Sequence, residues 1–178
     1  MHNRALHNPD QKAFTFLQDG ETESDSLTYK QLEQQAQAIA SQLQSLGFTG
    51  ERALLLYSPG LEFIVAFFGC LYAGVIGVPA YPPRSNQKMT RLSAIVADAS
   101  AKVALTTNSL LKDIKNRFAQ DSELSILNTL ATDNIDSNQA HKWEKPQVNS
   151  DTLVVCQGKF AKLNLDINVA FFYVHPWF

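Results

Sequence analysis

Residues 52–84 constrain the possible folds of this chain more than any other stretch. Residues 53–57 form a short apolar run between polar residues, which is typical of a strand buried on both faces. A helix is predicted over residues 61–73, with Gly74 ending it, and residues 75–78 are predicted to form a second buried strand. A strand, a helix and a strand in this order predict a βαβ unit with parallel strands and a right-handed crossover. Such a unit is the core of an α/β domain.

The predicted central helix has two further features. Ser58 is expected to be its N-cap, with Pro59 at the first helical position, where a missing N–H costs nothing. Its side chains are apolar nearly all round, so we expect it to be deeply buried rather than amphipathic. Pro79 is expected to end the strand that follows.

The same stretch has a second interpretation, as a membrane span. Residues 63–80 carry no charge, and a span needs about 20 apolar residues. However, Gly74, Gly77 and Pro79 interrupt the run, and no cluster of Lys or Arg flanks it. The buried α/β unit is therefore the favoured interpretation.

The remainder of the chain predicts further elements of an α/β domain. A hairpin is expected to begin with a strand over residues 13–17 and a turn at Asp19-Gly20. Thr28 and Gln31 have the spacing of a capping box, which predicts a helix that ends at Gly47. Further along, we expect an amphipathic helix over 89–99, a strand over 103–107, a helix over 110–118, a short strand over 125–127, a polar loop over 131–150 pinned by Trp143, and a strand over 151–156.

Composition excludes several classes of function. A chain of 178 residues is expected to form one domain, and its net charge of −2 with mixed signs argues against a nucleic-acid partner. Two cysteines are too few for a disulfide framework or a zinc cluster. The N-terminus has no apolar segment of the signal-peptide type, so we expect the cytoplasm.

No catalytic constellation is visible, and we predict no catalytic, cofactor-binding or metal-binding residue. The phosphate-binding, dinucleotide-binding and serine-hydrolase motifs are missing from the sequence. Ser58 is better explained as a helix cap than as a nucleophile, and Cys70 as a buried inert thiol. Arg84 is better explained as a solvated side chain than as a phosphate ligand. The four histidines, at positions 2, 7, 141 and 175, lack metal-ligand spacing and are expected in mobile segments.

Two blocks of the sequence resemble a known family. LTYKQLEQQAQAIASQL (27–43) and GCLYAGVIGVPAYPPR (69–84) are similar to the first two conserved blocks of adenylate-forming enzymes, and VPAYPPR is especially similar to fatty acyl-AMP ligases. The resemblance covers about residues 8–157. It implies activation of a fatty acid with ATP and magnesium to an acyl-adenylate. The acyl group then passes to an acyl carrier protein, or to coenzyme A in the sister ligases.

The chain departs from the family pattern after residue 157. A Ser/Thr/Gly-rich loop that cradles phosphates through backbone amides is expected there, but the chain has GKFAKLNLDINV (158–169). We therefore expect a mainly parallel sheet flanked by helices, an incomplete N-terminal subdomain of the adenylate-forming fold over 8–157. An alternating segment over 163–169 and the ending FFYVHPWF make residues 158–178 a divergent apolar tail.

These observations leave three functional hypotheses. The first is a fragment of a fatty acyl-AMP ligase, or of an acyl-CoA ligase, that is inactive alone, binds no cofactor by itself and self-associates through exposed apolar surface. The second is a non-catalytic binding or scaffold module that docks through its aromatic tail. The third, a complete small α/β enzyme, requires a site that the sequence does not show.

Overall fold

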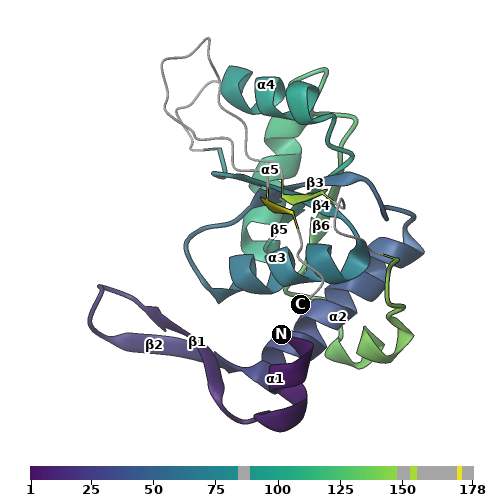
Figure 1. Cartoon of the computed structure of the whole chain (residues 1–178). Coiled ribbons are helices and arrows are strands. Elements are labelled where there is room, and N and C mark those ends of the chain that lie inside the picture. The colour runs from purple at the N-terminus through teal and green to yellow at the C-terminus, as the bar shows by residue number, and fades with distance from the viewer. Residues whose placement is uncertain (84–88, 148–152, 156–171, 174–178) are drawn as a thin grey trace.

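The computed structural model describes residues 1–83, 89–147, 153–155 and 172–173 of the chain. A hairpin and a larger sheet, both packed against helices, make up the described part (Figure 1). In chain order the elements are α1 (His2–His7), β1 (Lys12–Leu17), β2 (Glu23–Thr28), α2 (Tyr29–Ser45), β3 (Arg52–Leu56), α3 (Leu61–Ala73), β4 (Ile76–Ala80), α4 (Thr90–Ala99), β5 (Val103–Thr106), α5 (Asn108–Phe118), β6 (Asn128–Ala131), the 3₁₀ helix η1 (Ser137–Lys142), β7 (Leu153–Val155) and β8 (Phe172–Tyr173).

The larger sheet has the strand order β6-β5-β3-β4-β7-β8. Its first five strands pair in parallel, and β8 pairs antiparallel with β7. The predicted βαβ unit is confirmed, because β3 and β4 are adjacent and joined through α3, with Ala53 opposite Gly77. The predicted fold class, a mainly parallel sheet flanked by helices, is confirmed as well.

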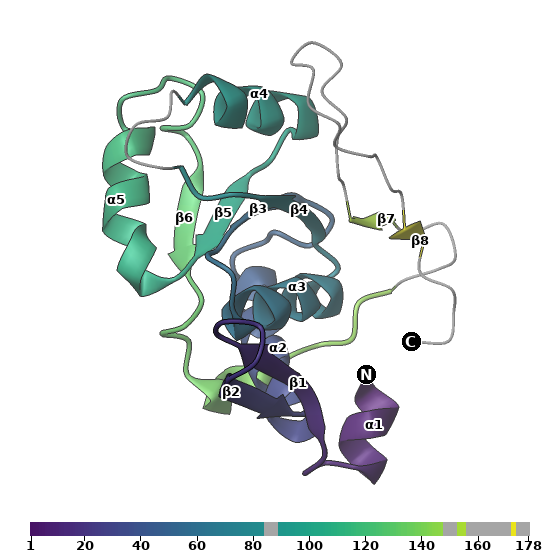
Figure 2. The same ribbon diagram turned by 90° about the vertical axis from the view of Figure 1, so that its left-hand side faces the viewer.

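Helices cover both faces of this sheet (Figure 2). Side chains alternate across a strand, so Leu55 and Leu54 of β3 point to opposite faces. Leu55 belongs to the core cluster that includes residues of α2 and α3, whereas Leu54 belongs to the cluster that includes residues of α4 and α5. Both leucines are fully buried, so two separate cores share one sheet.

Helix α2 begins as its sequence predicts. The Thr28 side chain accepts a hydrogen bond from the Gln31 backbone N–H, and the Gln31 side chain accepts one from the Thr28 N–H. Leu27 and Leu32, on either side of the cap, are both buried. Gly47, in the left-handed region with a φ of 76°, follows the helix end, and its freedom from a Cβ makes that conformation accessible.

Helix α3 differs from its prediction in two respects. Gly60, not Ser58, is the N-cap, and no side-chain cap hydrogen bond is present, because the helix begins at Leu61. Ser58 is exposed in the connecting loop. The prediction of deep burial was right for one side only. Leu61, Val65, Ala66, Gly69, Cys70 and Ala73 are buried, whereas the opposite side is partly open.

Helix α3 ends at Gly74, which has a φ of 70°, and a separate strand follows. That strand, β4, extends beyond its predicted end to Ala80, so Pro79 lies within it and pairs with Leu55. Proline lacks an N–H and is tolerated where one side of a strand has no ladder. In the part of the chain that the structure describes, β4 pairs with β7 at Gly77. Among the described residues no helix combines the length and the apolar character that crossing a membrane requires.

The predicted hairpin is confirmed, because β2, which follows the Asp19-Gly20 turn, pairs antiparallel with β1. One strand prediction was wrong. The short strand expected over 125–127 is a turn, and β6 follows it at 128–131. Leu124 and Leu127 are buried, whereas Ile126 is 81% exposed, as expected for a turn. These apolar residues lie close together in the sequence, so they resembled an apolar strand. The alternating segment 163–169 lies outside the described residues.

The polar segment after β6 is pinned to the body as predicted. The Trp143 ring N–H donates a hydrogen bond to the Tyr72 carbonyl at 2.7 Å, and the two rings lie 5.0 Å apart. This contact holds the segment that contains η1 beside the end of α3.

Candidate functional site

The carboxyl ends of the parallel strands are the natural place for a site. In open α/β sheets ligands bind outside these ends, where neighbouring strands send the chain to opposite faces. Strands β3 and β5 are such neighbours, because β3 leads to α3 on one face and β5 to α5 on the other. The residues that follow β3, β5 and β6 therefore define the candidate site.

A network of hydroxyl groups joins these strand ends. The Tyr57 hydroxyl lies 2.8 Å from the Thr132 hydroxyl, and the Thr106 hydroxyl donates to the Leu56 carbonyl at 2.8 Å. The Thr132 hydroxyl also donates to the Thr106 carbonyl at 3.3 Å. Burial raises the pKa of Tyr57 far above its ordinary value, so the phenol stays neutral and does not serve as a base. The network ties three strand ends together.

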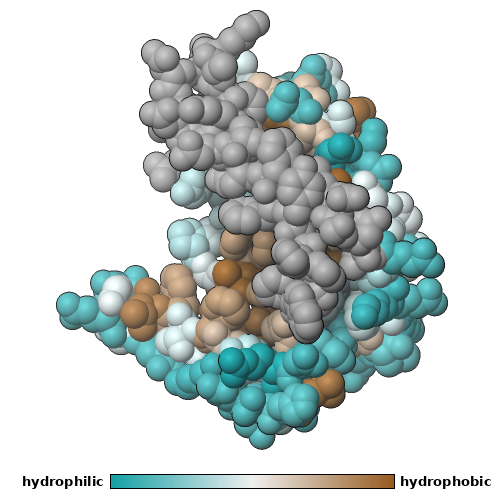
Figure 3. Space-filling view, in the orientation of Figure 1, coloured by the Kyte–Doolittle hydropathy of each residue, from teal (hydrophilic) through white to brown (hydrophobic). Residues whose placement is uncertain are grey.

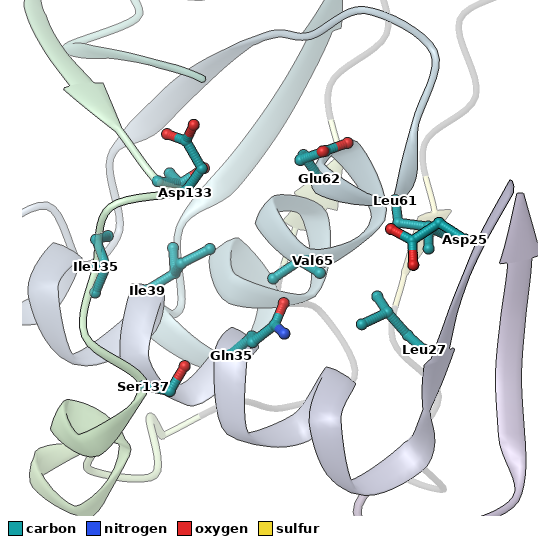
Figure 4. Close-up of a pocket in the computed structure, with 11 residues that line it drawn as sticks. Asp25, Leu27, Gln35, Ile39, Leu61, Glu62, Val65, Asp133, Ile135 and Ser137 are labelled. Atoms are coloured by element: carbon teal, nitrogen blue, oxygen red, sulfur yellow. The ribbon is translucent and has the colours of Figure 1, made fainter. Parts of the chain in front are cut away.

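Beside this network lies a cleft of about 260 Å³ between β2, α2, α3 and the segment after β6 (Figure 4). Its lining has apolar residues and several acidic or neutral polar ones. The lining residues are Asp25, Leu27, Gln35, Ile39, Leu61, Glu62, Val65, Thr132, Asp133, Ile135 and Ser137. None of these is Lys, Arg or His, so the cleft does not attract an anion.

Asp133 has a structural partner within this cleft. Its carboxylate accepts a hydrogen bond from the Asn108 backbone N–H at 2.7 Å. Asn108 is the first residue of α5, and a carboxylate is favourable at a helix N-terminus. The negative charge of Asp133 therefore already interacts favourably with the positive end of the α5 dipole.

A second cavity, of about 350 Å³, lies at the opposite, amino-terminal edge of the sheet. Glu51 and Lys102, which precede β3 and β5, line it together with the exposed Ile126. Ligands of open α/β sheets are not expected at this edge. The cleft at the carboxyl edge therefore remains the candidate site.

The residues singled out from the sequence do not gather at the cleft. Cys70 is buried in α3, as predicted, and burial raises the pKa of its thiol to about 12, which disfavours the reactive thiolate. His2 and His7 lie on helix α1 and His141 on η1. The His2 Nδ1 atom lies 2.5 Å from a Glu33 carboxylate oxygen. Arg84 and His175 lie outside the described residues.

Sequence reasoning missed the residues that form the carboxyl edge. Thr106, Thr132 and Asp133 come directly at or after the ends of β5 and β6. Hydroxyl and carboxyl groups just after buried strands could have indicated the site. They were overlooked because β6 was predicted three residues too early. Among the described residues, no group of three His, Cys, Asp or Glu side chains is arranged to hold a metal ion.

The comparisons with known proteins agree with the fold. Residues 1–167 match the family model described as AMP-binding enzyme. The chain is 46% identical over 158 residues to the medium-chain-fatty-acid–acyl-carrier-protein ligase JamA of Moorena producens, covering 86% of this chain and 27% of JamA. It is 36% identical over 134 residues to the long-chain-fatty-acid–AMP ligase FadD23 of Mycobacterium tuberculosis, covering 74% of this chain and 23% of FadD23.

A solved structure shows the same fold. It is a fatty acyl-adenylate ligase from L. pneumophila in complex with acyl adenylate and pyrophosphate, which superposes with a TM-score of 0.78 at 36% identity. The match covers 88% of this chain and 26% of that one. The chain thus spans about a quarter of the length of these relatives. The resemblance to adenylate-forming enzymes, and within them to fatty acyl-AMP ligases, is confirmed, and the chain belongs to the AMP-binding enzyme family.

Proposed function

We propose that this chain is part of an enzyme that activates a fatty acid as its acyl-adenylate and passes the acyl group to an acyl carrier protein. The observation that carries the proposal is the 46% identity with JamA over 86% of the chain. The name of that relative includes the carrier protein as acceptor, which favours it over coenzyme A. The cytoplasm remains our proposed compartment, because ATP is available there.

The proposed reaction has two steps. A carboxylate oxygen of the fatty acid attacks the α-phosphorus of ATP, the bond to the β-phosphate oxygen breaks, and pyrophosphate leaves. The thiolate of the carrier protein then attacks the acyl carbonyl carbon, and AMP leaves. In phosphoryl and nucleotidyl transfer, positioning and electrostatic stabilisation of the phosphates provide most of the catalysis.

The described residues do not fit ATP and magnesium by themselves. Asp25, Glu62 and Asp133 line the cleft at the carboxyl edge, and their negative charges oppose a triphosphate. No three side chains of the metal-ligating kinds gather in the described ranges. We therefore assign this chain the role of shaping the sheet and its carboxyl edge, and we assign it no step of nucleotide chemistry.

Two proteins test the proposal. One is the 178-residue chain alone, and the other is a chimera in which this chain replaces the matching segment of JamA. The assay is the exchange of labelled pyrophosphate into ATP with and without a medium-chain fatty acid. We expect exchange by the chimera that depends on the fatty acid, and none above background by the chain alone, because acidic side chains line the cleft at its carboxyl edge.

A cooperative urea transition first establishes that each protein is folded. A folded chimera without exchange would contradict the proposed enzyme class. Fatty-acid-dependent exchange by the chain alone would contradict the claim that it needs the rest of the enzyme. Transfer of the acyl group to coenzyme A but not to a carrier protein would overturn the proposed acceptor.

A further inference from the structure

Strand β6 is the outermost of the described strands at one end of the larger sheet. The strand order places β5 on one side of it and no described strand on the other (Figure 2). The exposure of its residues agrees with this position, because Asn128 is exposed and Thr129, Leu130 and Ala131 are partly exposed. All four residues of the neighbouring β5 are buried. In the described part of the chain, one side of β6 is therefore open.

Two hydrogen bonds show how the backbone of β6 is oriented. The Asn128 N–H donates to the Lys102 carbonyl at 3.4 Å, and the Thr132 N–H donates to the Thr106 carbonyl at 2.9 Å. Both acceptors belong to β5 or to the residue before it. Because backbone groups point alternately to the two sides of a strand, the residue midway between these two donors faces β5 as well.

That residue is Leu130, and its neighbours Thr129 and Ala131 direct their N–H and C=O groups away from β5. No turn, cap or side-chain hydrogen bond within the described residues uses these two N–H groups. We define the β6 edge as the outward backbone groups of Thr129 and Ala131. It presents donors and acceptors with the spacing that a further strand needs.

The β6 edge lacks the features that normally keep an open strand from pairing. Proteins protect such strands with charged side chains, proline, bulges or short length. Strand β6 has no charge and no proline, and its pairing with β5 has no register shift. The open strands elsewhere in the described part differ, since β1 and β2 contain Lys12, Glu23 and Asp25, and β8 has only two residues. Of the described strand edges, the β6 edge is thus the best suited to pairing.

An identical strand fits this edge with two-fold symmetry. When two copies of β6 pair antiparallel about Leu130, Thr129 of each copy lies opposite Ala131 of the other. Both residues carry outward groups, so each such pair can exchange two N–H···O=C bonds. A two-fold interface requires one self-complementary surface, and the β6 edge meets that requirement.

The side chain of Leu130 also favours an identical partner. It packs against the core cluster that includes residues of α2 and α3, yet it stays partly exposed. In the antiparallel arrangement it lies opposite Leu130 of the second copy as a non-hydrogen-bonded pair, in which cross-strand side chains are closest. Each leucine would cover the exposed part of the other.

We propose that the chain forms a dimer in which β6 pairs antiparallel with β6 of a second copy, so that the two larger sheets become continuous. This inference is independent of the proposed function, because it rests on the pairing of β6 and on no step of fatty-acid activation. The shared surface is centred on one short strand, so we expect a weak dimer whose population depends on protein concentration.

Cysteine cross-linking tests the register of the pairing in the full chain. In Leu130→Cys the new thiols of the two copies face each other across the symmetry axis, at a separation that a disulfide bridges. In Thr129→Cys, the matched control, each new thiol lies opposite Ala131 instead of its own counterpart. Both variants also carry Cys156→Ser, whereas Cys70 stays because it is buried. With oxidised glutathione we expect a disulfide-linked dimer from Leu130→Cys and at least about tenfold less from Thr129→Cys.

Thr129→Pro tests the backbone pairing itself. Proline removes the outward N–H of residue 129 and leaves the bonds to β5 intact, since residue 129 makes none of them. Each copy loses one hydrogen bond across the interface, so the dissociation constant should rise at least about tenfold, as sedimentation at protein concentrations up to roughly 1 mM measures. Thr129→Val is the control, because it keeps the N–H and the branched side chain and should dimerise like the unsubstituted chain. A cooperative urea transition establishes that each variant is folded.

Three results would overturn the proposed dimer. A monomeric mass at every concentration would exclude a second copy as the occupant of the β6 edge and leave it to a different partner. Equal cross-linking of Leu130→Cys and Thr129→Cys would assign the association to another surface. A folded Thr129→Pro that dimerises as strongly as Thr129→Val would show that the outward backbone groups are not used. If Thr129→Pro does not fold, the two cysteine variants decide the question.

Discussion

The two helix layers that cover the larger sheet differ in what they expose on their outer sides. Helices α4 and α5 bury one side and expose polar residues such as Lys112, Asp113 and Lys115 on the other. Helix α3 buries aliphatic and small residues on one side, whereas the large apolar residues on its opposite side pack against the same core and stay partly exposed. The layer of α4 and α5 is an outer layer, with polar side chains facing the solvent. The second has the composition of an inner layer.

Small residues allow the inner layer to pack closely. A Cβ added at Gly69 of α3 would lie 2.6 Å from the Ile39 Cγ2 atom of α2. The missing side chain thus lets the backbones of α2 and α3 approach. The outer layer shows a different kind of contact, since α4 is tied to the segment after α5 by a hydrogen bond from Ser93 to Asp121 at 2.7 Å.

The largest expected effect comes from truncating the two neighbouring leucines of β3. Leu54→Ala opens the core beneath α4 and α5, and Leu55→Ala opens the core beneath α2 and α3. Because both side chains are fully buried, each change should lower the free energy of unfolding by about 3 kcal/mol. Urea denaturation measures both.

Ile126→Ala serves as the control, with an expected change within about 0.5 kcal/mol because this side chain is exposed. A loss for Leu55→Ala much smaller than for Leu54→Ala would contradict the comparison. It would show that the inner layer is not firmly packed in this chain.

The next effect concerns the close approach of α2 and α3. In Gly69→Ala the new methyl group overlaps the Ile39 side chain, which must shift. Overpacking should cost about 2 kcal/mol and the higher helix propensity of alanine should offset about 1 kcal/mol, so we expect a net loss of about 1 kcal/mol.

Gly77→Ala is the matched control for this prediction. Its added Cβ would lie 3.4 Å from the Leu55 Cδ1 atom, an ordinary contact, so a change within about 0.5 kcal/mol is expected. If both glycine variants lose the same free energy in thermal or urea unfolding, the close helix contact is not the cause.

The smallest effect is electrostatic and belongs to the outer layer. The hydrogen bond from Ser93, followed by those from the Leu124 and Glu123 amides, holds the pKa of Asp121 below its ordinary value. Ser93→Ala should therefore raise the pKa of Asp121, which NMR titration of the carboxyl carbon measures.

The sign of the pH effect follows from that direction. A carboxyl whose pKa is depressed by folding contributes stability above its unfolded pKa, and this contribution disappears as the pH falls through the folded pKa. Ser93→Ala should thus weaken the dependence of stability on pH in the acid range. Ser125→Ala is the control, because that hydroxyl donates to the Ser122 carbonyl instead. An unchanged Asp121 pKa in Ser93→Ala would refute the assignment.

Local sequence signals predicted the elements whose causes are local. The capping box at Thr28 and Gln31 set the start of α2, and Gly74 set the end of α3. The apolar run of β3 and the adjacency of β3 and β4 followed from the βαβ pattern, because a short crossover leaves few other topologies. The fold class was therefore predictable from the sequence.

Elements defined by pairing were not predictable in the same way. Strand β2 was expected only as the second strand of a hairpin, because its polar sequence does not mark its bounds, and its pairing with β1 defines them. Strand β6 is short, and its place was missed because the apolar residues before it form a turn. The N-cap of α3 moved from Ser58 to Gly60 because the loop after β3, not the capping potential of serine, decides where the helix begins.

The candidate site shows the same division. The sequence by itself determined that the chain is an α/β domain and that Cys70 is buried, since both depend on composition and periodicity. It also determined that residues 27–43 and 69–84 resemble adenylate-forming enzymes, since that resemblance depends on motif. Only the tertiary structure decided that Tyr57, Thr106 and Thr132 meet at one edge of the sheet, and that one side of α3 stays partly exposed. Residues distant in sequence meet where strand order brings them together, and strand order is a property of the assembled sheet.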